Sequence, residues 1–210
     1  MKLLQMVQCT SESCGLRAPV LAHEVPESCP LCQSSIEKSG EPFRDHKMGD
    51  VPLSEPSHHI ELCMDNLRSA YNVGSLFRTS DGVGVKHIHL CGITPTPNNH
   101  KVAKTALDTE QTLPWTYYKN GLDAVRQLKA AGYEIWALEL TPNSESLWET
   151  PVPDKRVLLI VGSEVAGVDP AMLPMCDKVV SLPMMGVKQS LNVATATGIA
   201  LYQMQFGRPI

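Results

Sequence analysis

Ser190 and Asn192 stand two positions apart, shortly after a loop that contains Gly186, and both carry short polar side chains. The surrounding residues 181–193 join an apolar, strand-like run to a helix-like run that is rich in small residues. A packed core has no need for such a polar pair, whereas a cofactor pocket needs backbone donors, open space and short polar side chains. We therefore predict a ligand site in this segment.

Two further stretches share this character. Residues 72–85 open with Asn72 and carry Arg78 six positions later, and residues 159–169 carry Gly162 and Glu164 directly after an apolar run. At 100° per residue, Arg78 lies opposite the apolar face of a helix predicted over 73–83, with Asn72 as its cap. Glu164 follows a strand-like run, and open α/β sheets bind ligands at the carboxyl ends of their strands.

Taken in order, the three stretches resemble the signature motifs of the SpoU-type (TrmH-like) ribose 2′-O-methyltransferases of the SPOUT superfamily. The first matches N-x-G-x-x-x-R-T-x-D-x-x-G-V, the second G-x-E-x-x-G-V and the third L-P-M-x-G-x-x-x-S-L-N-V. Each motif alone is a weak signal, but three in the right order are specific. The resemblance covers residues 59–207.

This resemblance implies an α/β fold with a mainly parallel sheet and a C-terminal deep trefoil knot, although knots are rare in proteins. It implies transfer of a methyl group from S-adenosylmethionine to a ribose 2′-hydroxyl of tRNA or rRNA, by a homodimer that uses the last helix as an interface. The implied catalytic residues are Arg78, Asn72, Glu164, Ser190 and Asn192. The implied cofactor-binding residues are Leu138, Glu139, Gly162, Leu182, Met184, Gly186 and Leu191, with Leu138 and Glu139 acting through main-chain atoms.

The role of Arg78 has two possible forms. The resemblance makes it the base that removes the hydroxyl proton, but a guanidinium with a pKa above about 12 is a poor base at neutral pH. Arg78 therefore needs help from the substrate phosphate or from its surroundings. Otherwise it only clamps that phosphate and polarises the hydroxyl.

Two other function classes stay open at this point. One is a non-catalytic RNA-binding module on the same scaffold, and the other is a methyltransferase that acts on a protein or an RNA base. The net charge of −4 is not that of a strongly basic nucleic-acid binder, so RNA affinity must come from a local patch. The motif match outweighs this charge argument.

Four cysteines near the N-terminus have the spacing of a zinc ribbon. Cys9 and Cys14 form one pair, and Cys29 and Cys32 form a Cys-Pro-Leu-Cys pair fourteen residues later. Paired thiolates on two turns can close a tetrahedral site, and such a short segment has too few apolar residues to fold without one. We predict a structural zinc bound by these four residues. His23 lies between the pairs and could replace a cysteine, although a solvated histidine is the simpler interpretation.

The chain therefore divides into a zinc-ribbon-like segment (1–36), a linker (37–57) rich in proline, glycine and charge, and a methyltransferase domain (58–210). In this domain, strand-like runs over 60–64, 85–91, 133–140, 157–161 and 178–182 alternate with helical patterns over 73–83, 99–108, 120–131 and 190–206, as in a parallel α/β sheet. No apolar run is long enough for a membrane span, and seven cysteines fit a reducing compartment. We expect a cytoplasmic protein.

Overall fold

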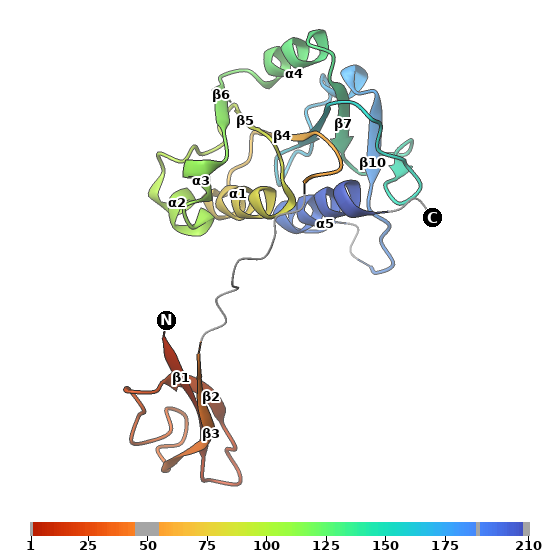
Figure 1. Cartoon of the computed structure of the whole chain (residues 1–210). Helices are drawn as coiled ribbons and strands as arrows, with labels where there is room; N and C mark the ends of the chain where they lie inside the picture. The colour runs from red at the N-terminus through yellow and green to blue at the C-terminus, as the bar shows by residue number, and fades with distance from the viewer. Residues whose placement is uncertain (1, 45–54, 188–189, 208–210) are drawn as a thin grey trace. The chain divides into compact units, whose positions relative to one another are not determined.

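The computed structural model describes residues 2–44, 55–187 and 190–207. The chain forms two compact units, Met1–Ser54 and Glu55–Ile210, which Figure 1 traces from the N-terminus to the C-terminus. The predicted linker is wrong over residues 37–44, because these residues form most of strand β3 (Ile36–Arg44). Most side chains of β3 are exposed, and the strand pairs with β1 through backbone hydrogen bonds. Its sequence therefore lacks the alternation of apolar and polar residues that would identify a strand. Residues 45–54 of that linker lie outside the described residues.

The N-terminal unit is a three-stranded antiparallel sheet. Strand β1 (Leu3–Cys9) lies between β2 (Arg17–Leu21) and β3. Within residues 2–44, the fully buried apolar side chains are Val7, Cys9 and Cys29. A core of this size is too small to hold a domain together without a further constraint.

The C-terminal unit is built on a seven-stranded sheet in which all neighbouring strands are parallel, so the predicted α/β class is confirmed. The strand order is β6-β5-β4-β9-β7-β10-β8. The strands are β4 (Ile60–Asp65), β5 (Ile88–Cys91), β6 (Trp115–Tyr118), β7 (Glu134–Leu138), β8 (Glu145–Ser146), β9 (Val157–Val161) and β10 (Lys178–Ser181). The short strands β6 and β8 were not predicted, since they lie at the two sheet edges and carry no buried residue.

The helices are α1 (Ala70–Val83), α2 (His100–Ala106), α3 (Thr109–Thr112), α4 (Gly121–Ala130) and α5 (Val193–Phe206), with a 3-10 turn at Leu173–Met175. Helix α1 starts earlier than predicted because Ser69 is its cap: the Ser69 hydroxyl accepts a hydrogen bond from the Asn72 N–H at 3.3 Å. Asn72 therefore lies in the first turn of α1 and leaves its amide free for other contacts. Helix α5 starts later than predicted, with Asn192 as its cap.

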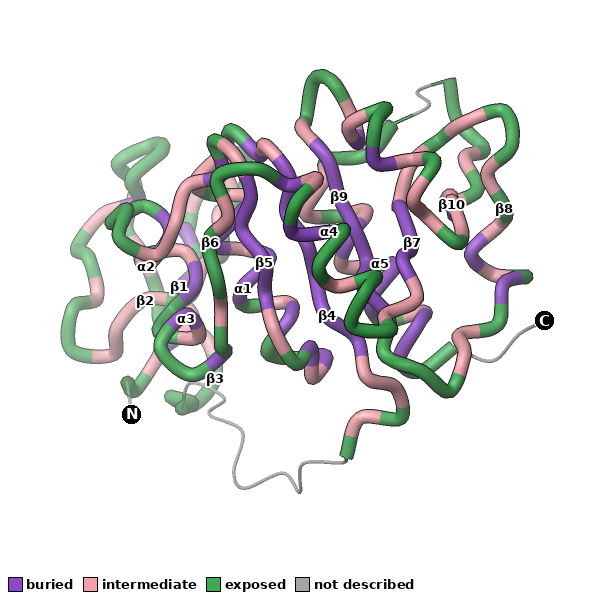
Figure 2. The backbone as a smooth tube through the Cα atoms, turned by 90° about the horizontal axis from the view of Figure 1, so that it is seen from above, coloured by how far each residue is buried: buried purple, intermediate pink, exposed green. Residues whose placement is uncertain are grey.

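Alternate residues along the strands enter two separate cores, as the period of a strand requires. In β9, Leu159 packs with α1 and α5 in the larger core, whereas Leu158 packs with α4 on the other face of the sheet. Figure 2 shows that the central strands β4, β9 and β7 are buried, and Figure 1 shows the sheet with α4 on one side and α1 and α5 on the other. The trefoil knot stays a prediction. No helix among the described residues is long and apolar enough to cross a bilayer.

One buried carboxylate ties β4 to its neighbours. Glu61 is 6% exposed, and its two oxygens lie 2.8 Å from His89 Nε2, 3.0 Å from His59 Nε2 and 2.6 Å from the Tyr133 hydroxyl. Burial raises the pKa of Glu61, but the hydrogen bonds from His89, Tyr133 and His59 outweigh this and lower the pKa to about 2. The carboxylate is therefore ionised at neutral pH and only accepts, so both histidines carry hydrogen on Nε2.

Replacement of Glu61 by glutamine should lower the free energy of unfolding by about 2–4 kcal/mol at pH 6, because a buried network loses its acceptor. The folded-state pKa of about 2 lies below the ordinary 4.5, so this contribution is complete above pH 4.5 and is lost as the pH falls toward 2. Urea denaturation of both proteins across this range tests it, with Glu149→Gln as the surface control. A difference that does not shrink on acidification contradicts the assignment.

Candidate active site

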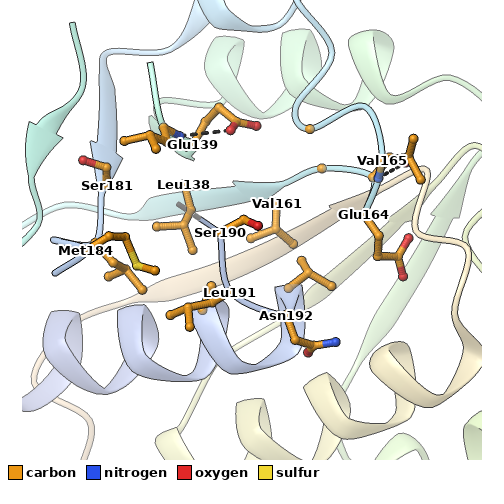
Figure 3. A pocket seen from close by; sticks show the side chains of 17 residues that line it. Leu138, Glu139, Val161, Glu164, Val165, Ser181, Met184, Ser190, Leu191 and Asn192 are labelled. Carbon is orange, nitrogen blue, oxygen red and sulfur yellow. Dashed lines mark hydrogen bonds between the residues drawn. The ribbon is translucent and has the colours of Figure 1, made fainter. Parts of the chain in front are cut away.

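A cavity of about 460 Å³ lies at the carboxyl ends of β7, β9 and β10 and is closed on one side by the start of α5. Its size is that of a pocket for a cofactor-sized ligand. Figure 3 shows Leu138, Val161, Met184 and Leu191 around the cavity, with Glu164 and Asn192 on one side. The full lining is Leu138, Glu139, Leu140, Val161, Gly162, Ser163, Glu164, Val165, Gly167, Ser181, Leu182, Met184, Ser190, Leu191, Asn192, Val193 and Ala196.

Most of the residues predicted from the second and third motifs meet at this cavity. Six of the predicted cofactor-binding residues line it, and so do three of the predicted catalytic residues, Glu164, Ser190 and Asn192. Gly186 is not part of the lining; it lies in an exposed loop, and a Cβ at this position would meet open space. Ser163, Val165 and Gly167 of the second motif also line the cavity, although they were not among the predicted site residues.

The glycines of the second motif shape the cavity wall. A Cβ at Gly162 would overlap the backbone of Gly167 and Val168, so the chain must pass here without a side chain. Gly167 has φ +72°, a left-handed conformation that favours glycine, and its N–H donates to the Ser163 carbonyl at 2.9 Å. The loop thus folds back on itself directly after β9.

Glu164 joins this loop to the start of α1. Its carboxylate accepts hydrogen bonds from the Arg68 N–H at 2.8 Å, the Ser69 N–H at 3.1 Å and the Asn72 amide at 2.9 Å. Partial burial raises the pKa of Glu164, but these donors lower it overall. An anion at a helix N-terminus also interacts favourably with the helix dipole. Glu164 is therefore an ionised, fully engaged acceptor at neutral pH.

Asn72 also forms a hydrogen bond with the N-cap residue of α5, Asn192. Its side-chain oxygen accepts a hydrogen bond from the Asn192 amide at 3.2 Å, and the Asn192 oxygen in turn accepts from the N–H groups of Ala194 at 2.9 Å and Thr195 at 3.3 Å. One chain of hydrogen bonds, Glu164–Asn72–Asn192, therefore joins all three motifs. We call it the motif chain.

Arg78 lies apart from the cavity. Its side chain is exposed on α1, is absent from the lining, and makes no hydrogen bond or ion pair with the part of the chain that the structure describes. Gly74, one helical turn before it, is explained by packing, because a Cβ there would lie 2.7 Å from Thr105 of α2. The first motif thus combines a packing glycine, a linking asparagine and an arginine left available to a ligand.

A second hollow, a groove of about 700 Å³, runs between α1 and α5. Asn72, Ser75 and Thr79 line it from α1, and Gly198, Ile199 and Tyr202 line it from α5. Ile199 is 38% exposed, Tyr202 50% and Phe206 57%, and these residues share one face of α5. This apolar face is therefore open to solvent beside the motif chain.

The N-terminal unit holds a separate candidate metal site. The Sγ atoms of Cys9, Cys14, Cys29 and Cys32 all lie within 4.8 Å of one another. The distances are 3.4 Å from Cys9 to Cys32 and 3.7 Å from Cys14 to Cys29, close to the edge of about 3.8 Å in a tetrahedron with Zn–S bonds of about 2.3 Å. His23 lies outside this cluster and pairs with Glu24 at the surface. The four sulfurs suffice for tetrahedral coordination.

Comparison with known proteins extends these observations. The tRNA (guanosine(18)-2'-O)-methyltransferase of Escherichia coli (strain K12) is 29% identical over 153 residues, which cover 73% of this chain and 66% of the relative. The protein of the same name from Aquifex aeolicus (strain VF5) is 32% identical over 160 residues, 73% of this chain and 72% of the relative. The AdoMet-bound rRNA methyltransferase of Sinorhizobium meliloti has a TM-score of 0.67 at 27% identity, over 71% of this chain and 56% of that chain.

The family match begins at residue 59, after the N-terminal unit, and ends at residue 202 within α5. It therefore takes in all three motifs and the entire parallel sheet. On this basis the chain belongs to the SpoU rRNA Methylase family.

Proposed function

We propose that this protein transfers a methyl group from S-adenosylmethionine to a ribose 2′-hydroxyl of tRNA or rRNA. The observation that carries the proposal is the motif chain, which brings Glu164, Asn72 and Asn192 together at the edge of a cofactor-sized cavity. The relatives named above support the same reaction class. A non-catalytic RNA-binding module would not need the motif chain at the edge of a cofactor-sized cavity.

The cavity fits the cofactor by its chemistry. The apolar side chains of Leu138, Leu182 and Leu191 offer flat contact to an adenine ring, and the loop at Gly162 exposes backbone groups to its polar atoms. Ser190 is exposed at the rim and is free to bond a ligand or a nucleotide. Bound S-adenosylmethionine supplies a methyl group already activated by a positively charged sulfur.

The protein then has to align the acceptor and remove its proton. Glu164 and Asn72 fix the first turn of α1, so the helix that carries Arg78 starts at a defined position beside the cavity. Arg78 clamps a substrate phosphate next to the reacting ribose and polarises the 2′-hydroxyl, whose proton leaves toward that phosphate. In this role Arg78 stays positively charged, whereas a role as the base would require it to lose a proton first.

Replacement of Arg78 by alanine should reduce methyl transfer by roughly 100-fold or more, because charge stabilisation at the acceptor is lost. Binding of S-adenosylhomocysteine should stay within about 2-fold of the unmodified protein, since Arg78 lies outside the cavity. The assay uses methyl-labelled S-adenosylmethionine and bulk RNA, followed by digestion to nucleosides. Arg126→Ala on α4 is the matched control.

Label in a 2′-O-methyl nucleoside that disappears with Arg78→Ala would support the reaction and identify the nucleotide. Label in a methylated base or in protein would show that the methyl acceptor is not a ribose 2′-hydroxyl. Near-normal transfer by Arg78→Ala would remove Arg78 from the mechanism. No labelling and no cofactor binding would favour the non-catalytic RNA-binding module.

We also propose that Cys9, Cys14, Cys29 and Cys32 bind one structural zinc ion. The four sulfurs lie within 4.8 Å of one another, and thiolate is a ligand that Zn²⁺ prefers in tetrahedral structural sites. Zinc binding contributes about 10–16 kcal/mol in comparable peptides, which a core of three buried apolar side chains does not supply. We place the protein in the cytoplasm, where thiols stay reduced.

Metal analysis of the purified protein should find one zinc ion per chain, and Cys14→Ser should lose it. Removal of zinc with a chelator should make residues 2–44 sensitive to protease, while residues 55–187 stay protected because they have their own core. Cys176→Ser, a cysteine of the other unit, is the control. Full zinc content in Cys14→Ser would contradict the four-cysteine site.

We propose further that α5 forms the interface of a homodimer. The helix is apolar on nearly all sides, and such a helix is normally covered all round, yet Ile199, Tyr202 and Phe206 are exposed. A second copy would cover this face beside the groove that contains Asn72 and Asn192.

Sedimentation equilibrium should therefore give twice the chain mass of 23.0 kDa. Ile199→Asp should produce monomers, because a carboxylate would be buried in the interface. Ile93→Asp is the matched control, since Ile93 is also exposed but lies in the loop after β5. A dimer that survives Ile199→Asp unchanged would exclude this face.

A further inference from the structure

Glu139 follows β7, the strand that lies between β9 and β10 in the sheet. Its backbone N–H donates to the Val180 carbonyl of β10 at 3.0 Å. Its side chain turns to the other neighbour, where Oε2 accepts a hydrogen bond from the Val168 N–H at 2.8 Å. A single residue thus connects the end of β7 to the segments on both sides of it.

Both oxygens of the Glu139 carboxylate accept a hydrogen bond. Its second oxygen accepts the N–H of Leu140 at 2.9 Å, so each oxygen serves one backbone donor. Val168 is only 3% exposed, and without Glu139 its N–H would lose its partner in a place that water scarcely reaches. A Cβ at Gly167 would overlap Glu139 Oε2, so the turn is shaped around this carboxylate.

The loop held in this way is the wall of the cavity. Gly162, Ser163 and Gly167 line it, as does Glu139 itself. Figure 3 shows Glu139 and Glu164 at separate places along this wall. The loop is therefore attached twice: Glu164 fixes its tip to α1, and Glu139 fixes its end at Val168 to β7.

We infer that Glu139 is a positioning residue, whose side-chain carboxylate holds the loop over 162–168 in the shape that binds the cofactor. This replaces the expectation that Glu139 acts through its main chain alone. The inference rests on the proposed function, because S-adenosylmethionine is the ligand that the loop would contact. The effect of the Glu139 carboxylate on the shape of the loop does not depend on which RNA acceptor is methylated.

Glu139→Gln tests the inference at nearly constant volume. A glutamine amide has one accepting oxygen, so one of the two backbone N–H groups must face a donor. The dissociation constant for S-adenosylhomocysteine should rise about ten-fold, as expected for the loss of one hydrogen bond to a charged group. The KM for S-adenosylmethionine should rise likewise, with kcat at saturating cofactor within about 2-fold.

Amide hydrogen exchange adds a readout that a general loss of stability would not produce. The amides of Leu140 and Val168 should exchange faster in Glu139→Gln, while those of β4 stay protected. Glu149→Gln is the control, because Glu149 is an exposed carboxylate without a side-chain bond to the described residues. It should match the unmodified protein in every measurement.

Weaker cofactor binding together with local exchange in Glu139→Gln supports the inference. If the unmodified protein binds S-adenosylhomocysteine and Glu139→Gln binds it equally well, the inference is overturned and the proposed function stands. If the unmodified protein does not bind S-adenosylhomocysteine, the proposed function fails and takes the cofactor role of Glu139 with it. Unchanged exchange at Val168 overturns the loop-shaping role in either case.

Discussion

The carboxylate of Glu164 at the start of α1 is the contact on which the site depends. The N–H groups of Arg68 and Ser69, directly before α1, and the side-chain amide of Asn72 in its first turn all donate to this carboxylate. A negative charge at this end of the helix also interacts favourably with the helix dipole. Arg68 and Glu164 lie 96 residues apart in the sequence, and Asn72 and Asn192 lie 120 residues apart. Three motifs that are distant in the chain therefore act as one structural unit.

The parallel sheet makes this contact possible. Because all seven strands run the same way, the segments after β7, β9 and β10 emerge at one edge, and the cavity forms between them. Helices α1 and α5 pack on the same face through the larger core, which brings their first turns to that edge. Glu139 connects the end of β7 to β10 and to Val168 in the loop after β9, so the cavity wall is fixed by hydrogen bonds as well as by packing.

Much of this was accessible from the sequence. Strong apolar runs such as β9 predicted a parallel α/β sheet, and the glycine and polar patterns of the motifs located the cavity. The predicted start of α1 was wrong because serine and asparagine are both good N-cap residues. In the structure Ser69 is the cap, and the side chain of Asn72 instead donates to Glu164. Strand β3 was missed because its side chains are exposed, and the side-chain role of Glu139 was missed because its partner Val168 lies 29 residues away.

We propose that the cavity between β7, β9 and α5 binds the cofactor. A crystal structure of the protein with S-adenosylhomocysteine would decide this. We expect the adenine between Leu138, Leu182 and Leu191, with the Gly162 loop against the ligand and the motif chain intact. A ligand bound elsewhere, or a site in which Glu164 has left the first turn of α1, would contradict it.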